Sequence, residues 1–238
     1  MKIKTLGILG GVGPLASVYF ADLVVNLTDA DTDQEHIPLI LYNDNSIPDR
    51  TAYILGRSDI DPVPRIVEDI KKLADFGSDF IVITCNTAHT FYDAFQSASD
   101  VPVINMIDEA VNATLKARPN AKKIGVLATD GTLQSGVYKK AIEERGLAYL
   151  VPSEPSQRDV MSLIYDQVKA GKEADLRQLL RVIDEMRHMG CDVIILGCTE
   201  LSVINKQHNL SLHSGDIVDA MEALAKTCIT LCGRQIKE

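Results

Sequence analysis

The sequence lacks any long apolar run and any cluster of basic residues. Its 238 residues carry 24 lysines and arginines against 33 aspartates and glutamates, which gives a formal net charge of −9. Without a basic run the chain cannot neutralise a phosphate backbone, so nucleic acid is excluded as an expected partner. No apolar stretch approaches the roughly 18 residues that predict a membrane helix, so no membrane partner is expected either.

Cysteine is also scarce, with five residues, an odd number, and no disulfide-framework spacing. The chain runs from residues 1–2 directly into a predicted strand, without the charged and apolar regions of a secretory signal. We therefore expect free thiols and a cytoplasmic location. Cys228 and Cys232 lie four apart on a helical pattern, where buried thiols with a structural role are commoner than a redox or metal pair.

Short apolar or β-branched runs predict strands, and longer amphipathic stretches between most of them predict helices. Continuous apolar strands such as Phe80–Ile83 are typical of a parallel sheet that is covered on both faces. The predicted fold class is therefore α/β with mostly parallel sheets. The predicted strands are 3–9, 38–42, 80–84, 101–104, 123–128, 148–151 and 193–197.

Two segments repeat one layout. Residues 76–89 and 189–200 each run from a helix end through Gly-x-Asp and a buried strand to a cysteine, Cys85 in the first and Cys198 in the second. A similar glycine-containing strand precedes each segment. The repeat predicts two similar α/β lobes related by a pseudo-two-fold axis, with the two thiols facing each other.

The lobes are predicted to be discontinuous in sequence. We assign 1–102 plus 211–238 to the first lobe and 103–210 to the second, because the closing helical pattern, 216–232, would pack back on the first lobe. In parallel α/β sheets ligands bind beyond the carboxyl ends of the strands, where both cysteines lie. The active site is therefore expected in the cleft between the lobes.

The loop Gly11-Val12-Gly13 follows a strand, opens a helix and fits the start of the dinucleotide-binding pattern. That pattern needs an acidic residue about 20 positions on, but the natural candidate, Asp44, lies 33 positions after Gly11. The second half lacks the pattern altogether. We therefore favour a tight turn with Pro14 as the first helical residue, whose exposed amides, including that of Val12, can hold a carboxylate.

A cysteine between a strand and a helix start lies near the positive end of the helix dipole, which lowers its pKa from about 8.5. One such cysteine indicates covalent catalysis with a histidine base nearby. Two such cysteines on opposite faces of one substrate carbon indicate two-base proton transfer. With each sulfur roughly 3 to 3.5 Å from that carbon, the two sulfurs would lie about 7 Å apart. For either residue alone an ordinary buried cysteine is the alternative, and without a closed ligand set zinc is set aside.

Several motifs together resemble the aspartate/glutamate racemase family, and within it the cofactor-independent aspartate racemases, over essentially the whole chain. These motifs are Gly10-Gly11-Val12-Gly13-Pro14, Ile47-Pro48-Asp49-Arg50-Thr51, Cys85-Asn86-Thr87-Ala88-His89, Leu127-Ala128-Thr129-Asp130-Gly131-Thr132, Ile164-Tyr165 through Lys169-Ala170-Gly171, and Gly197-Cys198-Thr199-Glu200. The glutamate branch typically begins with Asp-Ser-Gly and has Cys-Thr-His as its second motif. Glu200 therefore favours the aspartate branch.

The resemblance implies a direct reaction, in which one thiolate removes the α-proton of a free amino acid and the opposite thiol protonates the other face. Cys198 would act on the L substrate and Cys85 on the D substrate. The expected activity is the interconversion of L- and D-aspartate, with glutamate as a second substrate. The resemblance also implies that no cofactor or metal is needed and that the protein is a homodimer.

Without a cofactor, the site must supply donors to the α-carboxylate, where negative charge grows. The expected donors are Asn86, Thr87, Thr129, Thr132 and Thr199. Each lies beside one of the cysteines or in the matching motif of the second half.

The distal carboxylate of an acidic substrate also needs a cation. Arg50 suits this role because a guanidinium binds a carboxylate through two hydrogen bonds. Lys169 matches the second basic residue of the family, although a lysine near a helix end also complements the dipole. Glu200 is expected to bind the substrate ammonium or to orient Cys198, and His89 is expected to be structural.

One departure from the family is expected after the second cysteine. Family members usually carry an acidic residue in a segment resembling Leu-Ile-Asp-Pro, whereas 212–216 reads Leu-His-Ser-Gly-Asp. This departure bears on the closing segment and on substrate preference. Two alternatives stay open: a racemase of the same superfamily with a broad-range or hydantoin substrate, and an inactive protein that binds an acidic metabolite.

Overall fold

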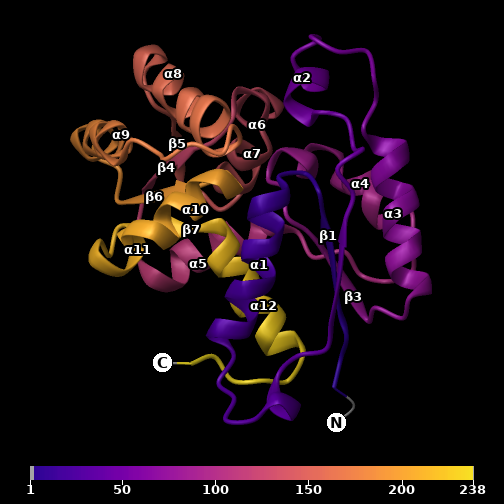
Figure 1. Cartoon of the computed structure of the whole chain (residues 1–238). Coiled ribbons are helices and arrows are strands. Elements are labelled where there is room, and N and C mark those ends of the chain that lie inside the picture. Colours follow the sequence, from indigo (N-terminus) through magenta and orange to yellow (C-terminus); the bar gives the residue numbers. More distant parts are fainter. Residues whose placement is uncertain (1–2, 238) are drawn as a thin grey trace.

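Two parallel sheets, one from each half of the chain, form the frame of the molecule (Figure 1). The computed structural model describes residues 3–237, and residues 1–2 and 238 lie outside the described residues. The strand order is β2-β1-β3 in the first sheet and β5-β4-β6-β7 in the second, with every pair of neighbours parallel. The strands are β1 Leu6–Gly10, β2 Leu39–Asn43, β3 Phe80–Ile83, β4 Lys123–Leu127, β5 Ala148–Leu150, β6 Val193–Leu196 and β7 Ile217–Asp219. The predicted α/β class is confirmed.

The predicted duplication is present in the fold. β1 lies between β2 and β3 as β4 lies between β5 and β6. In each half a glycine with positive φ precedes the strand that leads to the cysteine: Gly77 (93°) before β3 and Gly190 (84°) before β6. Asp79 then accepts a 2.7 Å hydrogen bond from the backbone of Thr5, before β1, and Asp192 accepts a 2.9 Å bond from the backbone of Lys123, where β4 begins. The repeated Gly-x-Asp therefore joins equivalent strands in the two halves.

Helices cover both sheets (Figure 1). The α-helices are α1 Pro14–Leu27, α2 Arg50–Ile54, α3 Val63–Asp75, α4 Tyr92–Gln96, α5 Met106–Ala117, α6 Asp130–Ser135, α7 Val137–Glu143, α8 Glu154–Ser162, α9 Leu176–His188, α10 Thr199–His208, α11 Leu210–His213 and α12 Ala220–Leu231. Two 3₁₀ turns, η1 Asp33–Glu35 and η2 Thr87–Phe91, and one π-helix, η3 Leu163–Val168, complete the set. Among the described residues, no helix has the length and apolar composition needed to cross a membrane.

The longer amphipathic helices follow from sequence periodicity. α9 buries Leu179, Val182, Ile183 and Met186, whose spacing places them on one face of a helix. Asp175 is its N-cap, and the Asp175 carboxylate accepts hydrogen bonds from the free backbone amides of the first turn. The same helix ends before Gly190, which has positive φ, and the chain then continues into β6 and Cys198.

One strand prediction is wrong, and one strand was missed. Residues 101–104 form an isolated bridge in which Val103 pairs with Ile81, because Pro102 has no N–H and cannot donate to a sheet ladder. The strand β7 was not predicted, because its three residues are too few to reveal a period.

The closing segment also corrects the expected departure from the family. The strand-then-aspartate pattern is present at Ile217–Asp219, where the Asp219 carboxylate caps α12. Residues 212–216 instead lead from α11 into β7, and Asp216 binds Arg187 at 2.7 Å. The closing segment therefore carries the acidic residue that the sequence interpretation had missed.

The division into 1–102 plus 211–238 and 103–210 stays a prediction. Within it, β7 pairs with β6 of the second sheet, whereas α12 packs against both α1 and α5. The end of the chain thus contacts elements of both halves.

Candidate active site

Both predicted catalytic cysteines line one small cavity, which lies beyond the carboxyl ends of β1, β3, β4 and β6. Its volume is about 10 Å³, which is room for about one water molecule. The cavity is lined by Val12, Asp49, Arg50, Thr51, Cys85, Asn86, Thr87, Thr129, Tyr165, Lys169, Cys198, Thr199 and Glu200. Every predicted site residue except Thr132 therefore lies at this cavity.

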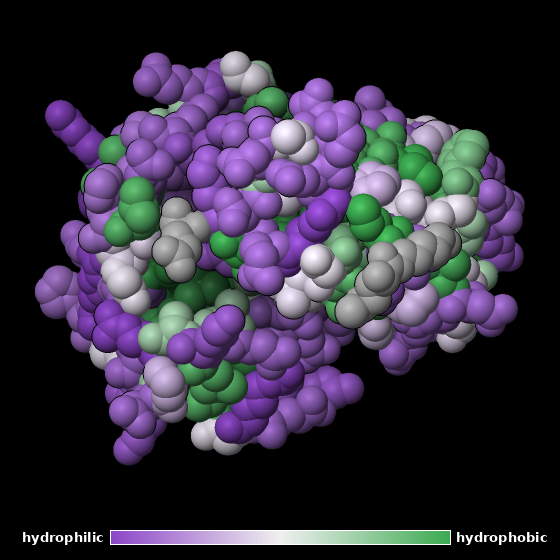
Figure 2. Space-filling model, turned by 90° about the horizontal axis from the view of Figure 1, so that it is seen from below, coloured by the Kyte–Doolittle hydropathy of each residue, from purple (hydrophilic) through white to green (hydrophobic). Residues whose placement is uncertain are grey.

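A larger cavity, of about 870 Å³, lies between α1, α5, α11 and α12 and contains none of the predicted site residues. Figure 2 shows a hollow with a hydrophobic floor on the face seen from below. Its two lysines are already paired, Lys206 with Asp22 and Lys226 with Glu222. We place the active site in the small cavity, because the thiols and the unpaired donors are there.

The glycine loop before α1 forms a tight turn, as predicted. A Cβ atom on Gly11 would lie 2.0 Å from the backbone oxygen of Asp44, and one on Gly13 would lie 2.7 Å from Oε1 of Glu200. Both glycines have positive φ, 85° and 143°. Ser17 fixes the turn by accepting from the Gly11 amide at 3.2 Å and donating to the Gly13 carbonyl at 2.9 Å. The glycines therefore allow close approach of protein atoms within this loop.

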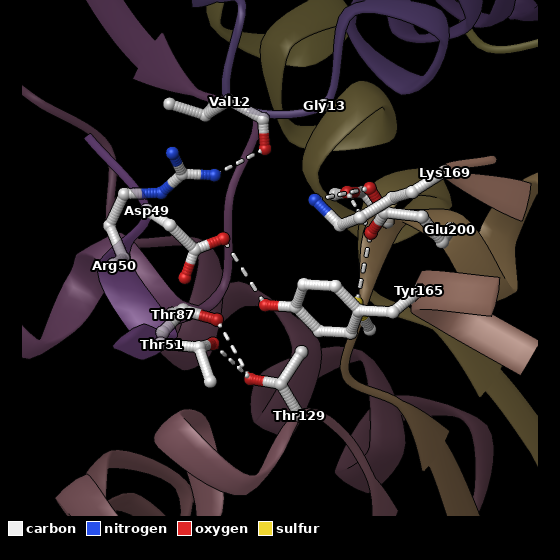
Figure 3. A network of polar contacts seen from close by, with 12 residues as sticks. Val12, Gly13, Asp49, Arg50, Thr51, Thr87, Thr129, Tyr165, Lys169 and Glu200 are labelled. Carbon is white, nitrogen blue, oxygen red and sulfur yellow. Dashed lines mark hydrogen bonds and ion pairs between the residues drawn. The ribbon is translucent and has the colours of Figure 1, made fainter. Parts of the chain in front are cut away.

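Arg50 is buried at the edge of the cavity, with 6% of its surface exposed. Figure 3 shows its guanidinium donating to the carbonyl of Val12, at 2.8 Å, and a second bond reaches the carbonyl of Pro48 at 3.0 Å. Val12 thus contributes its carbonyl here. The buried Nε of Arg50 has no hydrogen-bond partner among the described residues. Burial lowers the pKa of Arg50, but the Cys85 sulfur and the Asp49 carboxylate raise it by more, so the guanidinium stays charged.

The loop after β3 fixes Cys85 through its backbone. His89 accepts at Nε2 from the Met106 amide (3.1 Å), so its Nδ1 carries the proton and donates to the Cys85 carbonyl at 2.8 Å. Burial lowers the pKa of His89, which keeps the ring neutral. The predicted structural role of His89 is confirmed. The next residue after the cysteine, Asn86, has a buried Nδ2 without a partner among the described residues.

Cys198 lies at the start of α10 and donates from Sγ to Oε2 of Glu200 at 3.0 Å. The Thr199 hydroxyl donates to the same oxygen at 3.2 Å, and Lys169 pairs with the other oxygen at 3.1 Å (Figure 3). Burial lowers the pKa of Lys169, but Glu200 and both cysteines raise it by more. Glu200 is therefore held between a thiol and a cation inside the protein.

The expectation that the helix start lowers the pKa of Cys198 is wrong. Burial raises the pKa of this thiol well above its usual range, and the Glu200 carboxylate raises it further. Lys169 acts in the opposite direction but does not reverse the effect. Cys198 is therefore a thiol near neutral pH.

Four threonine hydroxyls join the two halves beside the cavity. Thr87 bonds to Thr132 at 2.8 Å and to Thr129 at 3.1 Å, and Thr51 donates to Thr129 at 3.1 Å. Thr132 lies behind the cavity wall, where it supports Thr87 and Thr129. The halves meet closely here, because a Cβ atom on Gly131 would lie 2.8 Å from the Cα of Thr51.

Three cavity residues were absent from the predicted site: Asp49, Thr51 and Tyr165. Tyr165 donates to Asp49 at 3.3 Å across the halves (Figure 3), and Lys169 lies on the same helical turn with Nζ 5.3 Å from the Tyr165 ring centre. Burial raises the pKa of Tyr165 to about 12. All three lie inside the family motifs, but a motif gives no side-chain direction, so their contacts could not be predicted.

The cavity is lined by two cations, Arg50 and Lys169, and by two carboxylates, Asp49 and Glu200. Arg50 from the first half and Lys169 from the second both stay protonated, and each can bind a carboxylate. No group of three or more His, Cys, Asp or Glu side chains among residues 3–237 is arranged to hold a metal ion. The arrangement can therefore bind an anion and exchange protons through two thiols.

Comparison with known proteins identifies the family of the chain. Residues 9–228 match the profile of the Asp/Glu/Hydantoin racemase family. The chain is 30% identical over 232 residues to the broad specificity amino-acid racemase RacX of Bacillus subtilis (strain 168), over 94% of this chain and 96% of that protein. It is 32% identical to the glutamate racemase of Aquifex pyrophilus, over 64% of this chain and 58% of that protein. The structure of Picrophilus torridus aspartate racemase matches with a TM-score of 0.83 and 33% identity, over 98% of this chain and 96% of that chain.

Proposed function

Because the chain belongs to the Asp/Glu/hydantoin racemase family and is a racemase, we propose that it interconverts L- and D-aspartate by proton transfer between Cys85 and Cys198. One observation carries the proposal: these two cysteines, one from each half, line a single cavity together with the cations Arg50 and Lys169. Similarity to Picrophilus torridus aspartate racemase along 98% of the chain supports aspartate as the substrate.

The reaction needs one thiolate and one thiol. The thiolate takes the α-proton and becomes a thiol, which leaves the electron pair on the α-carbon. The opposite thiol then donates its proton to the other face and becomes a thiolate. After one turnover the protonation states of Cys85 and Cys198 are exchanged, and the next turnover in the same direction requires them to be restored.

Two unpaired donors support an anionic ligand. Buried polar groups in folded proteins almost always have partners, and an unsatisfied buried donor costs about 1–3 kcal/mol. Arg50 Nε and Asn86 Nδ2 are both buried without a partner among the described residues, and both residues line the cavity. A carboxylate of the substrate would accept hydrogen bonds from both donors. If it is the α-carboxylate, the donors would also stabilise the negative charge that grows there during the reaction.

The proposal also requires the cavity to enlarge. A volume of about 10 Å³ is far smaller than an aspartate molecule. The contact that joins the two halves across it, Tyr165 with Asp49, would separate for the substrate to enter. Closure around the substrate would then exclude water and strengthen every charge interaction within the site.

The reaction is tested by proton NMR of L-aspartate and D-aspartate, each incubated with dialysed protein in D₂O without added cofactor. We expect loss of the α-proton signal from both enantiomers, with optical rotation falling to zero. Cys85→Ser and Cys198→Ser should each abolish racemisation. Cys191→Ser changes a half-buried cysteine outside the cavity and should remain active. Full activity in either cavity variant would refute the two-base reaction, and aspartate binding without exchange would favour an inactive binding protein.

A second candidate is a racemase with a broader substrate range, which the similarity to RacX over 94% of the chain favours. Arg50→Lys separates the two candidates, because lysine keeps the charge but cannot form two parallel bonds to a carboxylate. If aspartate is the substrate, kcat/KM should fall for aspartate much more than for alanine. An equal fall for both amino acids would favour the broad-range enzyme.

We also propose that the protein is a cytoplasmic homodimer. All five cysteines are free, which supports a reducing compartment. Light scattering of the purified protein would test the oligomeric state.

A further inference from the structure

Tyr138 connects the neighbours of the two cysteines although it does not line the cavity. It belongs to α7 in the second half and is 1% exposed. Its hydroxyl donates to Oδ1 of Asn86 in the first half, at 2.6 Å. Asn86 directly follows Cys85, so the bond joins the second half to the loop that carries the first cysteine.

The bond to Tyr138 determines what Asn86 presents to the cavity. An amide group has its oxygen and its nitrogen on opposite sides, so an Oδ1 that accepts from Tyr138 directs Nδ2 away from that tyrosine. The Nδ2 atom is buried and without a partner among the described residues, and Asn86 lines the cavity. The tyrosine therefore leaves two N–H groups of Asn86 available to a ligand.

The Tyr138 ring is itself fixed from the other side. A Cβ atom on Gly197 would lie 2.9 Å from Cε2 of Tyr138, so the ring packs directly on the residue before Cys198. Burial raises the pKa of Tyr138 well above its usual range, and the nearby Asp219 and Cys198 add to this effect. The hydroxyl therefore stays protonated and remains a donor near neutral pH.

We propose that Tyr138 is a positioning residue for the racemase reaction, which orients the Asn86 amide so that its Nδ2 donates to a substrate carboxylate. This inference rests on the proposed function for the identity of the substrate. Tyr138 does not touch the reacting atoms, and it acts only through Asn86.

The test is a double-mutant cycle with Tyr138→Phe, Asn86→Ala and the double variant. Tyr138→Phe keeps the ring on Gly197 and removes only the hydroxyl. Because a hydrogen bond to a charged group is at stake, we expect Tyr138→Phe to lower kcat/KM about tenfold for both enantiomers, and Asn86→Ala at least as much. The double variant should lose no more than Asn86→Ala alone. Circular dichroism melts would establish that each variant is folded at the assay temperature.

A merely structural role for Tyr138 gives a different result. Tyr138→Phe would then lower activity by the same factor with and without Asn86, and that result would overturn the inference. Unchanged kcat/KM in Tyr138→Phe would overturn it as well. Failure of the wild-type protein to racemise aspartate would instead count against the proposed substrate, and the same cycle would be run with the amino acid whose α-proton does exchange.

Discussion

Replacing Glu200 with glutamine should make Cys198 more reactive. Glu200 accepts from Cys198 Sγ at 3.0 Å, and its carboxylate is one of the causes that raise the pKa of this thiol. The substitution removes that negative charge and leaves Lys169, which favours the thiolate, without its partner. Both changes lower the pKa of Cys198 and therefore increase the fraction of thiolate at a fixed pH.

The size of the effect follows from the distance. Two unit charges about 3 Å apart interact by about 5 kcal/mol at an effective dielectric constant of about 20. The carboxylate charge is shared between two oxygens, and Lys169 lies 3.1 Å from the second one. We therefore expect about a quarter to a half of that energy, about 1.4 to 2.7 kcal/mol, which corresponds to a 10- to 100-fold rise in thiolate at a fixed pH.

The assay is the rate of alkylation by iodoacetamide from pH 6 to 9, in a Cys85→Ser background that leaves Cys198 as the one cysteine lining the cavity. Mass spectrometry of the Cys198 peptide identifies the modified thiol. Glu222→Gln, which removes a carboxylate of the larger cavity, serves as the matched control and should not change the rate. An unchanged or slower reaction of Cys198 in folded Glu200→Gln would refute the reasoning.

Two further predictions concern stability. Lys169→Met leaves the buried Glu200 without its cation and should lower the free energy of unfolding by about 3 kcal/mol in urea titrations. Adding Glu200→Gln should recover most of this loss. A loss under about 1 kcal/mol would contradict the burial argument. Gly131→Ala brings a methyl group within 2.8 Å of the Thr51 backbone and should lower the free energy of unfolding by about 1–3 kcal/mol in the same titration. A variant as stable as the wild type would mean that α2 and α6 separate freely.

The sequence was informative where chemistry is carried by local patterns. In each half a strand is followed by a cysteine and a small polar residue. This repeat predicted two parallel sheets, which are present, and both cysteines line one cavity. The glycine loop was correctly interpreted as a turn, because its rival pattern requires an acidic residue at a distance that the chain does not provide.

The contacts between halves could not be predicted, because no sequence spacing encodes them. Tyr165 and Asp49 are 116 residues apart and meet only in the folded chain. The direction of the Cys198 pKa was wrong for the same reason: the dipole argument concerns one helix, whereas burial depends on all the elements around it. Thr132 was predicted as a donor to the substrate, but it lies behind the cavity wall, and that place depends on how α6 meets η2.

The two halves repeat the cysteine but not the residue two positions beyond it, which is Thr87 after Cys85 and Glu200 after Cys198. Enantiomers have equal free energies in water, so racemisation has an equilibrium constant of one. The Haldane relation then requires equal kcat/KM in the two directions, whatever differences the halves contain. The asymmetry between threonine and glutamate can therefore make kcat and KM differ between the two enantiomers only in the same proportion. An enantiomer with the lower KM must also have the lower kcat.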